Sequence, residues 1–271
     1  MPEAAAPFDA AARTYDADFT ATPLARELRG RVWTRLDTLY SAGDHVLELA
    51  CGTGEDARHL AQRGVQVVAT DQSPAMLDAA RAKAAGLPIQ VQPFNLLTLA
   101  PGEAGLDGPF DGVFSNFGGL NALADYAPLA GWLAVRVRPG GRLLFIIMGR
   151  WCAWEIVWHL AHGRPGQAVR RLRPGGAPAR LGAAQMTVHY PSTTRLRRAF
   201  RPGFELASVR PLGLLLPPSY LEPLTRRRYF PWRGAVAADR RARWPLWADH
   251  TVYEFVRRDG RDGEGGGSAY S

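Results

Sequence analysis

Residues 44–71 constrain the fold of this 271-residue chain more than any other stretch. A short apolar run from Val46 to Leu49 is bounded by turn residues, which predicts a strand covered on both faces. Glu55 and Asp56 then open a segment with helical apolar spacing, and acidic side chains suit the positive end of a helix dipole. A second apolar run ends at Asp71. This order of strand, turn, helix and strand predicts parallel pairing.

The turn after the first strand carries the strongest functional signal. Gly52 and Gly54 let the backbone approach a ligand where a β-carbon would collide with it. Asp71 stands 17 residues after Gly54, at the end of the next strand, where a carboxylate can accept both hydroxyls of a ribose. The third glycine of a Gly-x-Gly-x-x-Gly loop is missing, which argues against a nicotinamide or flavin site.

The stretch Glu48-Leu-Ala-Cys-Gly-Thr-Gly54 resembles the first motif of class I S-adenosylmethionine-dependent methyltransferases, Asp/Glu-x-Gly-x-Gly-x-Gly. Ala50 takes the place of the first glycine. The resemblance continues through Asp71 and Met76, through Phe110-Asp-Gly-Val-Phe-Ser-Asn116, and through Arg138-Pro-Gly-Gly-Arg-Leu-Leu-Phe145. Four matches in this order over about a hundred residues make the signal specific.

The resemblance implies an α/β fold with a doubly wound, mostly parallel, seven-stranded Rossmann-like sheet. The apolar runs predict the first five strands near 45–50, 65–70, 89–94, 110–116 and 142–148. Helical spacing predicts helices at 23–40 and near 55–63, 74–85 and 123–137. Strand character returns at 186–190, 204–210 and 250–256, and the last two fit the antiparallel hairpin that closes such a sheet.

Four parts of the chain follow from this organisation. Residues 1–40 are expected to form an N-terminal helical segment over the cofactor site, irregular up to Tyr15, and residues 41–150 the cofactor-binding core. Residues 151–258 are expected to form an acceptor cap and the closing strands, with a loop at 163–180 and an inserted lid at 214–246. Residues 259–271 read as a disordered tail.

The implied cofactor is S-adenosylmethionine, with S-adenosylhomocysteine as its product. By resemblance, Glu48 lies near the methionine part and Asp71 binds the ribose. Gln72 and Met76 flank the adenine, although a methionine there also fits a core role. The full expected cofactor set is Tyr15, Arg31, Glu48, Ala50, Cys51, Gly52, Thr53, Gly54, Asp71, Gln72, Met76, Asn95, Leu96, Asn116 and Phe117.

Some members of this set carry open alternatives. Asn95 and Leu96 stand where many relatives have an acidic residue that binds the adenine amino group, and an amide adds no charge there. The N-terminal segment is expected to close over the cofactor's carboxylate with Tyr15 and with Arg29 or Arg31. Either arginine singly also fits the solvent side of a helix.

Methyl transfer from a sulfonium is an in-line displacement that mainly needs positioning and exclusion of water. A general base is required only for a poorly acidic hydroxyl or a cationic amine. His189 with Tyr190 is the preferred base among the candidates after the fifth strand, because the pair follows a predicted strand in the cap; the others are His159, His162 and His250.

Composition bounds the remaining choices. Two cysteines, Cys51 and Cys152, predict no disulfide framework, and the absence of a signal segment leads us to expect a cytoplasmic protein with no transmembrane segment. No metal motif occurs. The net charge of +8 comes almost wholly from arginine, since Lys83 is the single lysine, and it fits either a solvated surface or an RNA-binding patch.

The tryptophans at 151, 154 and 158 have three interpretations: helix core, an acceptor pocket, or a surface patch at a membrane, the last weakened because no basic face accompanies them. We therefore expect a methyltransferase that acts on oxygen or nitrogen of a small, hydrophobic or aromatic molecule, with nucleic acid disfavoured as partner. The alternatives are an RNA methyltransferase using the arginine-rich segments 164–180 and 226–243, or a related protein that binds the cofactor without methyl transfer.

Overall fold

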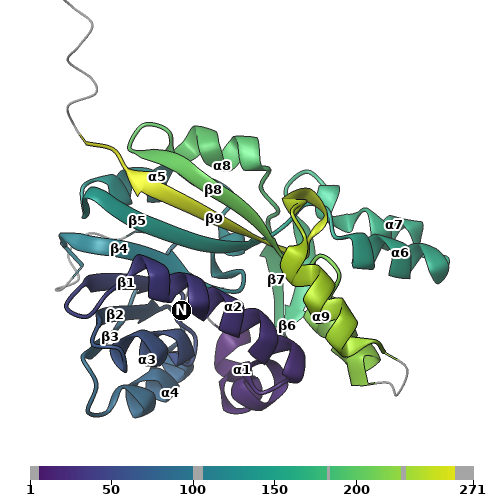
Figure 1. Ribbon diagram of the computed structural model, residues 1–271, viewed down its shortest axis with the longest axis horizontal. Coiled ribbons are helices and arrows are strands. Elements are labelled where there is room, and N and C mark those ends of the chain that lie inside the picture. The colour runs from purple at the N-terminus through teal and green to yellow at the C-terminus, as the bar shows by residue number, and fades with distance from the viewer. Residues whose placement is uncertain (1–5, 100–105, 182–183, 227–229, 260–271) are drawn as a thin grey trace, which may run out of the picture.

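The computed structural model describes residues 6–99, 106–181, 184–226 and 230–259. Its centre is a seven-stranded sheet with the order β3-β2-β1-β4-β5-β9-β8 (Figure 1). The strands from β3 to β5 run parallel, whereas β9 is antiparallel to both β5 and β8. This is the Rossmann-like methyltransferase fold that the sequence predicts. The strands are β1 (His45–Leu49), β2 (Gln66–Asp71), β3 (Ile89–Pro93), β4 (Phe110–Ser115), β5 (Val137–Met148), β8 (Phe204–Leu212) and β9 (His250–Arg257).

Helices cover both faces of this sheet. One face packs against α2 (Pro23–Leu39), α3 (Glu55–Ala61) and α4 (Pro74–Ala84), and the other against α5 (Ala127–Ala134) and α8 (Thr193–Phe200). Successive strand residues serve opposite faces: Val46 and Phe114 pack with the first group, and Leu47 and Val113 with the second. Because side chains alternate along a strand, a strand buried on both sides is mostly apolar, and the buried Glu48 is the exception in β1.

Local sequence fixes where the two long helices begin. Thr22 accepts a hydrogen bond from the Ala25 amide at 3.2 Å, and Pro23 follows as the first residue of α2. Ser73 caps α4 in the same way, with Pro74 next and the Met76 amide at 3.2 Å. The second cap places the start of α4 directly after the carboxyl end of β2.

The N-terminal segment differs from the prediction of an irregular chain up to Tyr15. It forms α1 (Ala6–Tyr15) and a π-helical turn, η1 (Asp16–Thr20). Asp9 on α1 accepts a hydrogen bond of 3.2 Å from the Ala75 amide and another from the Ser73 hydroxyl. Contacts with a segment more than sixty residues away therefore stabilise α1, a helix that was not predicted from the alanine-rich sequence.

Other boundaries also shift. In place of one helix at 123–137, the chain has a short 3₁₀ turn, η2 (Gly119–Ala122), and then α5. The strand expected at 142–148 begins at Val137, because Val137 pairs with Phe110 across a register irregularity in β4. The predicted closing hairpin of β8 and β9 is confirmed.

The segments after β5, apart from α8, β8 and β9, build the cap, which projects from one end of the sheet (Figure 1). The expected loop at 163–180 instead contains α7 (Pro165–Ala168), η3 (Arg170–Leu172) and most of β6 (Ala177–Leu181), which pairs with β7 (Ala184–Val188). The segment between β8 and β9 is helical. The other cap elements are α6 (Ala153–Ala161), η4 (Ser219–Arg226), α9 (Trp232–Arg241) and η5 (Pro245–Trp247).

Two findings concern larger-scale expectations. None of the helices within the described residues has the length and hydrophobicity that a bilayer crossing needs. The tail expected to be disordered lies, from residue 260 on, outside the described residues.

Candidate functional site

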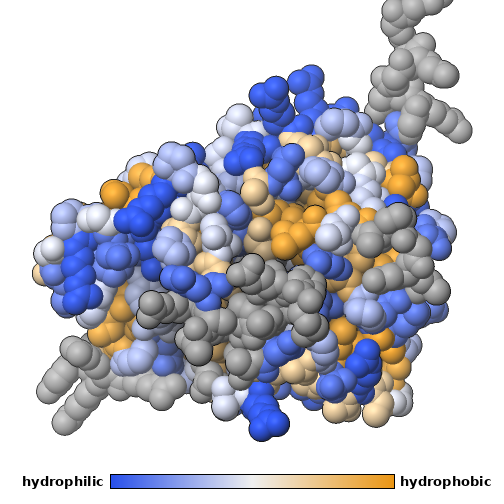
Figure 2. Space-filling view, turned by 180° about the vertical axis from the view of Figure 1, so that it is seen from behind, coloured by the Kyte–Doolittle hydropathy of each residue, from blue (hydrophilic) through white to orange (hydrophobic). Residues whose placement is uncertain are grey.

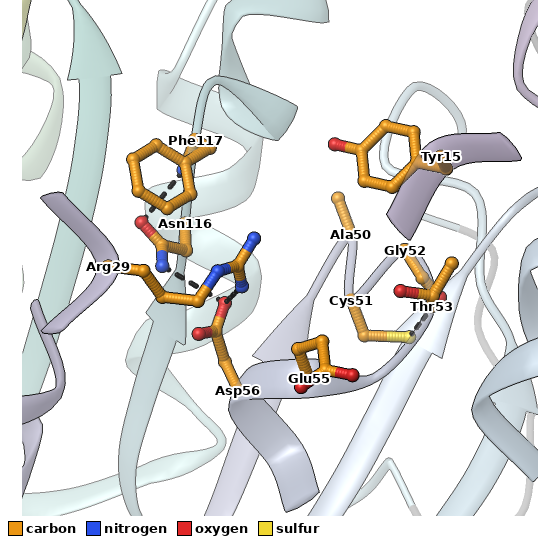
Figure 3. Close-up of a pocket in the computed structure, with 10 residues that line it drawn as sticks. All are labelled: Tyr15, Arg29, Ala50, Cys51, Gly52, Thr53, Glu55, Asp56, Asn116 and Phe117. Atoms are coloured by element: carbon orange, nitrogen blue, oxygen red, sulfur yellow. Dashed lines mark hydrogen bonds and ion pairs between the residues drawn. The ribbon is translucent and has the colours of Figure 1, made fainter. Parts of the chain in front are cut away.

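A small cavity lies over the carboxyl ends of β1 and β4 (Figure 3). The N-terminal segment contributes one wall, the turn after β1 contributes the floor, and the residues after β4 contribute the opposite wall. This is the crevice where the fold class binds nucleotides. The lining residues are Tyr15, Arg29, Ala50, Cys51, Gly52, Thr53, Glu55, Asp56, Asn116 and Phe117.

The turn after β1 is held in left-handed conformations. Gly52 has φ +54° and Gly54 has φ +78°. A β-carbon on Gly54 would lie 3.0 Å from the Ala80 β-carbon, whereas one on Gly52 would meet no protein atom within 4 Å. The space above Gly52 is therefore open for a ligand, and the space beside Gly54 is used for packing against α4.

Ala50 adopts φ +56°, a conformation that favours the glycine of the motif it replaces. Its β-carbon points toward the start of η2. A β-carbon on Gly119 would lie only 2.5 Å from it. The methyl group at position 50 is therefore accommodated by a glycine on a different loop.

Asp71 ends β2 beside this turn. Its carboxylate accepts hydrogen bonds from the amides of Gly52 and Ser73, both at 2.9 Å. Burial raises the pKa of Asp71, while these amides favour its ionised form. The carboxylate thus braces the glycine turn, although Asp71 is not among the residues that line the cavity.

A second acidic group, Asp56, organises the far wall. It accepts hydrogen bonds from Arg29 Nη1 at 2.6 Å, Trp33 Nε1 at 2.6 Å and Asn116 Nδ2 at 3.0 Å. The sequence shows Asp56 only as an acidic residue in the first turn of a helix, so its role in the site was missed. Its three partners come from α2 and from the end of β4, which only the fold brings together.

Three buried polar atoms on β1, α2 and β4 have no hydrogen-bond partner among the described residues. Glu48 Oε2, Arg29 Nε and Ser115 Oγ are buried and make no hydrogen bond within the described part of the chain. Burial, together with the nearby Asp56, raises the pKa of Glu48 well above its ordinary value. Buried polar groups normally have partners, so the unpaired Nε of Arg29, a residue that lines the cavity, is available to a ligand.

Arg29 and Arg31 occupy different surroundings. Arg29 lines the cavity, and its guanidinium carbon lies 5.0 Å from the centre of the Phe117 ring. Arg31 faces away from the cavity and pairs with Glu27 at 2.8 Å and with Asp239 of α9 at 2.5 Å. The structure therefore brings Arg29, and not Arg31, into the candidate site.

The N-terminal segment is fastened over the turn by the single lysine. Lys83 Nζ lies 2.5 Å from Asp16 and 2.7 Å from Glu55, and Asp16 also accepts a hydrogen bond of 2.7 Å from Thr53. Tyr15 precedes this latch, and burial raises the pKa of its hydroxyl. The latch closes the cavity on the side of α1.

The expected adenine residues lie outside the cavity lining. Met76 is buried in the first turn of α4, which leaves its core interpretation open. Gln72 follows β2 directly. Asn95 accepts a hydrogen bond from the Leu97 amide at 2.8 Å, and Leu96 packs in the core.

The two catalytic candidates also lie outside the cavity lining. The His189 amide donates to the Asn121 carbonyl at 2.7 Å, and the Asn121 side chain donates to the His189 carbonyl at 2.7 Å. Burial lowers the pKa of His189, and the positive charge of Arg195 lowers it further. The Tyr190 ring lies against Arg171, 5.2 Å from the guanidinium carbon.

A different histidine touches the cavity wall. His250 begins β9 opposite Met148 of β5, and its ring meets the Phe117 ring edge-on with 5.6 Å between centres. His250 Nδ1 lies 3.0 Å from Asp249 Oδ2. Sequence spacing alone gave no reason to prefer it over His189.

Asp249 belongs to a buried charged cluster in the cap. Arg171 Nη2 lies 2.6 Å from Asp249 Oδ1 and 2.6 Å from Glu155 Oε2, and Arg170 also pairs with Glu155. Burial by itself would raise the pKa of Asp249, but His250 and Arg171 hold it well below its ordinary value. Asp249 is therefore ionised at neutral pH.

Among the described residues, no group of histidine, cysteine and acidic side chains is arranged to hold a metal ion.

Comparison with known proteins gives a family for the core. Residues 46–141 match the family model of a methyltransferase domain. The demethylmenaquinone methyltransferase of Beutenbergia cavernae is 36% identical over 140 residues, which make up 51% of this chain and 54% of that protein. That of Mycolicibacterium vanbaalenii is 36% identical over 142 residues, 52% of this chain and 58% of its own length. The chain therefore spans about half the length of the curated relatives it matches.

Solved structures share the fold over nearly the whole chain. The CcbJ methyltransferase from Streptomyces caelestis has a TM-score of 0.60 at 18% identity, covering 93% of this chain and 98% of that one. The complex of DhpI with SAH has a TM-score of 0.58 at 19% identity, covering 94% and 95%. At these identities the likeness shows the fold alone.

Proposed function

Because residues 46–141 place this chain in the class I, Rossmann-like methyltransferase superfamily, we propose that it transfers a methyl group from S-adenosylmethionine to a small molecule. The acceptor atom is an oxygen or nitrogen of a hydrophobic or aromatic compound. The observation that carries the proposal is the cavity over the carboxyl ends of β1 and β4, where the lining residue Arg29 keeps a buried Nε without a partner in the described chain and a β-carbon on Gly52 would meet no protein atom within 4 Å.

The residues present fit this cofactor. Its amino-acid end carries one carboxylate and one ammonium group. Arg29 offers an unpaired Nε–H for the carboxylate, and Glu48 offers an unpaired carboxylate oxygen for the ammonium. Asp71, which ends β2 and accepts a hydrogen bond from the Gly52 amide, is proposed to accept the ribose hydroxyls, and residues Ala50 to Thr53 line the cavity beside it.

We propose that the remaining members of the expected cofactor set have the roles that the resemblance implies. Tyr15 covers the site from α1, and Asn116 and Phe117 face the region of the transferable methyl. The residues around the adenine, after local adjustment of their side chains, are Gln72, Met76, Asn95 and Leu96. Arg29 takes the place proposed for Arg31, since Arg31 is engaged with Glu27 and Asp239.

The acceptor is proposed to enter from the cap side. The cap contributes half-buried aromatic side chains, including Trp154, which lies 6.4 Å from the Phe230 ring, and Tyr190. Flat apolar walls suit an aromatic acceptor. The demethylmenaquinone methyltransferases that match the core support an acceptor of this class.

When bound, S-adenosylmethionine supplies a methyl group on a positively charged sulfur. The chain's own residues then align the acceptor, exclude water and take up a proton if the acceptor is a hydroxyl or a cationic amine. We assign the proton acceptor to His250, because ionised Asp249 faces Nδ1 and leaves Nε2 to receive a proton at the wall formed by Phe117. His189 with Tyr190 is the rival assignment from the sequence.

Matched variants separate the two histidines. His250→Ala should lower kcat by about 10²–10⁴-fold, the range that general-base catalysis contributes, and leave the affinity for S-adenosylhomocysteine unchanged. His189→Ala should change kcat by less than threefold, roughly the scatter of a neutral substitution. A large loss in His189→Ala, with His250→Ala active, would move the proton acceptor to the hairpin of β6 and β7.

The function itself is tested by calorimetry with S-adenosylhomocysteine and by transfer of a labelled methyl group to a panel of phenols, amines, carboxylic acids and demethylmenaquinone. Saturable binding and a labelled product are expected. Binding without product across the panel would favour a protein that uses the cofactor site without methyl transfer. Absence of binding would overturn the proposal.

A further inference from the structure

Exposed hydrophobic side chains are concentrated in the cap. Of the twelve large hydrophobic residues that are exposed in the described chain, nine lie between residues 151 and 247. Trp244 is 75% exposed, Val157 65% and Leu246 61%. Large exposed hydrophobic groups gathered in one region indicate an interaction surface. The other six are Trp151, Leu160, Val169, Leu215, Tyr220 and Trp247.

Ring contacts hold these segments together. The rings of Trp151, before α6, and Trp247, in η5, lie 5.6 Å apart. Phe230, before α9, lies 6.4 Å from Trp154 of α6. The same elements project together from the end of the molecule away from β3 (Figure 1). In the reverse view this end shows hydrophobic residues set directly among strongly hydrophilic ones (Figure 2).

The exposed charge on this surface has one sign. In segments 150–173 and 213–247 the carboxylates of Glu155, Glu222 and Asp239 are all buried. The exposed charged side chains described in these segments are all arginines. They are Arg150, Arg164, Arg173, Arg233, Arg240, Arg241 and Arg243, and of these Arg240 is paired with Glu27 of α2 at 2.9 Å.

This pairing of tryptophan, aliphatic and arginine side chains is the composition of a lipid headgroup contact. Tryptophan rings sit at the boundary of headgroups and acyl chains, and aliphatic side chains enter it. Each arginine near an anionic surface adds about 1 kcal/mol of attraction. Nucleic acid would use the arginines and stack on rings, but it offers nothing for Val157, Leu160 and Leu246.

We propose that the cap, through α6, α9 and η5, docks on an anionic membrane surface. Four of the seven exposed arginines come from α9 and the loop after it, about eighty residues beyond the tryptophans of α6, so the sequence alone did not connect them with those tryptophans. If the proposed function holds, this docking gives a hydrophobic acceptor a direct path from the bilayer to the cap. The docking itself does not depend on methyl transfer.

Vesicle flotation of the full chain tests the proposal. We expect binding to vesicles of phosphatidylcholine with 30% phosphatidylglycerol, about tenfold weaker binding to phosphatidylcholine alone, and a decrease as salt screens the arginines. The double variant Trp244→Ser with Leu246→Ser should weaken binding at least fivefold. The matched control is Val135→Ser, since Val135 is 77% exposed but lies outside the cap.

A second pair of variants tests the charge. Arg241→Gln with Arg243→Gln should remove the preference for anionic vesicles. Arg197→Gln with Arg198→Gln, exposed on α8, should not. These polar surface variants keep the test available if the tryptophan variant fails to fold.

Three outcomes would overturn the proposal: no binding to anionic vesicles, tighter binding of the same surface to an RNA oligonucleotide, or a dimer in light scattering that buries Trp244 and excludes vesicles. Methyl transfer with soluble acceptors is measured in parallel. If the full wild-type chain transfers methyl groups but does not bind anionic vesicles, the docking proposal alone is refuted. If it binds the vesicles but transfers no methyl group, the proposed enzyme activity alone is refuted.

Discussion

Two buried clusters of charged residues, one in the cap and one in the crevice, differ in how fully their polar atoms are hydrogen-bonded. In the cap, Arg171 reaches both Glu155 and Asp249, and its remaining donors meet the backbone carbonyls of Gly149 and Asp249. In the crevice, Arg29 and Glu48 each keep a buried polar atom without a partner. Of the two arginines, Arg29 therefore keeps unsatisfied hydrogen-bonding capacity, whereas the donors of Arg171 have partners.

This difference separates structural from functional charge. A closed network lowers the energy of the folded chain and gains nothing from a ligand. An open one destabilises the folded chain slightly and recovers that energy when a ligand arrives. The following substitutions sharpen or break the comparison.

The closed cluster should give the largest effect on stability. Asp249→Ala should lower the free energy of unfolding by about 3–5 kcal/mol, because it leaves Arg171 buried without its carboxylate. Urea denaturation measures the change. The control Asp78→Ala breaks only an exposed pair with Arg81 and should cost less than about 1 kcal/mol. Equal losses in the two variants would show that the cap charges are not interlocked.

The crevice should respond in affinity instead. Asp71→Ala should weaken binding of S-adenosylhomocysteine by about 1–3 kcal/mol through lost hydrogen bonds, as titration calorimetry would show. Asp71→Asn keeps one acceptor oxygen and should lose less. An unchanged affinity in Asp71→Ala would remove this carboxylate from the ribose site.

Two glycines separate backbone strain from ligand contact. Gly52 and Gly86 both have positive φ, and a β-carbon on either would meet no protein atom within 4 Å. Gly52→Ala and Gly86→Ala should therefore each lower stability by about 1–2 kcal/mol. Only Gly52→Ala should weaken cofactor binding. Equal binding by the two variants would place the cofactor away from the turn.

Glu48 should give the smallest and most diagnostic change. Its pKa in the folded chain is raised, so the folded state holds this proton more tightly than the unfolded state does. Stability from this group is therefore lost as pH rises above its ordinary value of 4.5. Glu48→Gln should raise Tm by roughly a few degrees at pH 7–8.

The same variant should weaken cofactor binding. A bound ammonium group favours the ionised carboxylate, so binding to the wild-type chain should release a proton and strengthen with pH. Glu48→Gln should lose that pH dependence. A stabilised variant with undiminished affinity would show that Glu48 is merely an unsatisfied core residue.

The sequence predicted the core of the fold because its signals are local. The apolar runs at Val46–Leu49 and Val65–Ala69 and the glycine turn specify the strands and their order without distant information. The cap was less predictable. Arg171 and Asp249 are 78 residues apart, and neither carries a motif that names the other.

The rotation of α2 about its own axis was also not predictable from the sequence. Arg29 and Arg31 are two residues apart on α2, about 200° around its axis, and they flank opposite sides of the buried stripe of Leu28, Val32 and Leu36. Only the packing of α2 against the sheet decides which arginine faces the crevice. The helix α1 was missed for a similar reason, since Asp9 finds its partners on α4.

Ala50 and Gly119 have a consequence for how this loop can vary. The methyl group at position 50 fills the space that any side chain at position 119 would need. A homologue that restores glycine at 50 is thereby free to place a small side chain at 119, but a chain with alanine at 50 is not. The two positions form an exclusive pair across the crevice floor, so substitutions there must occur in a fixed order.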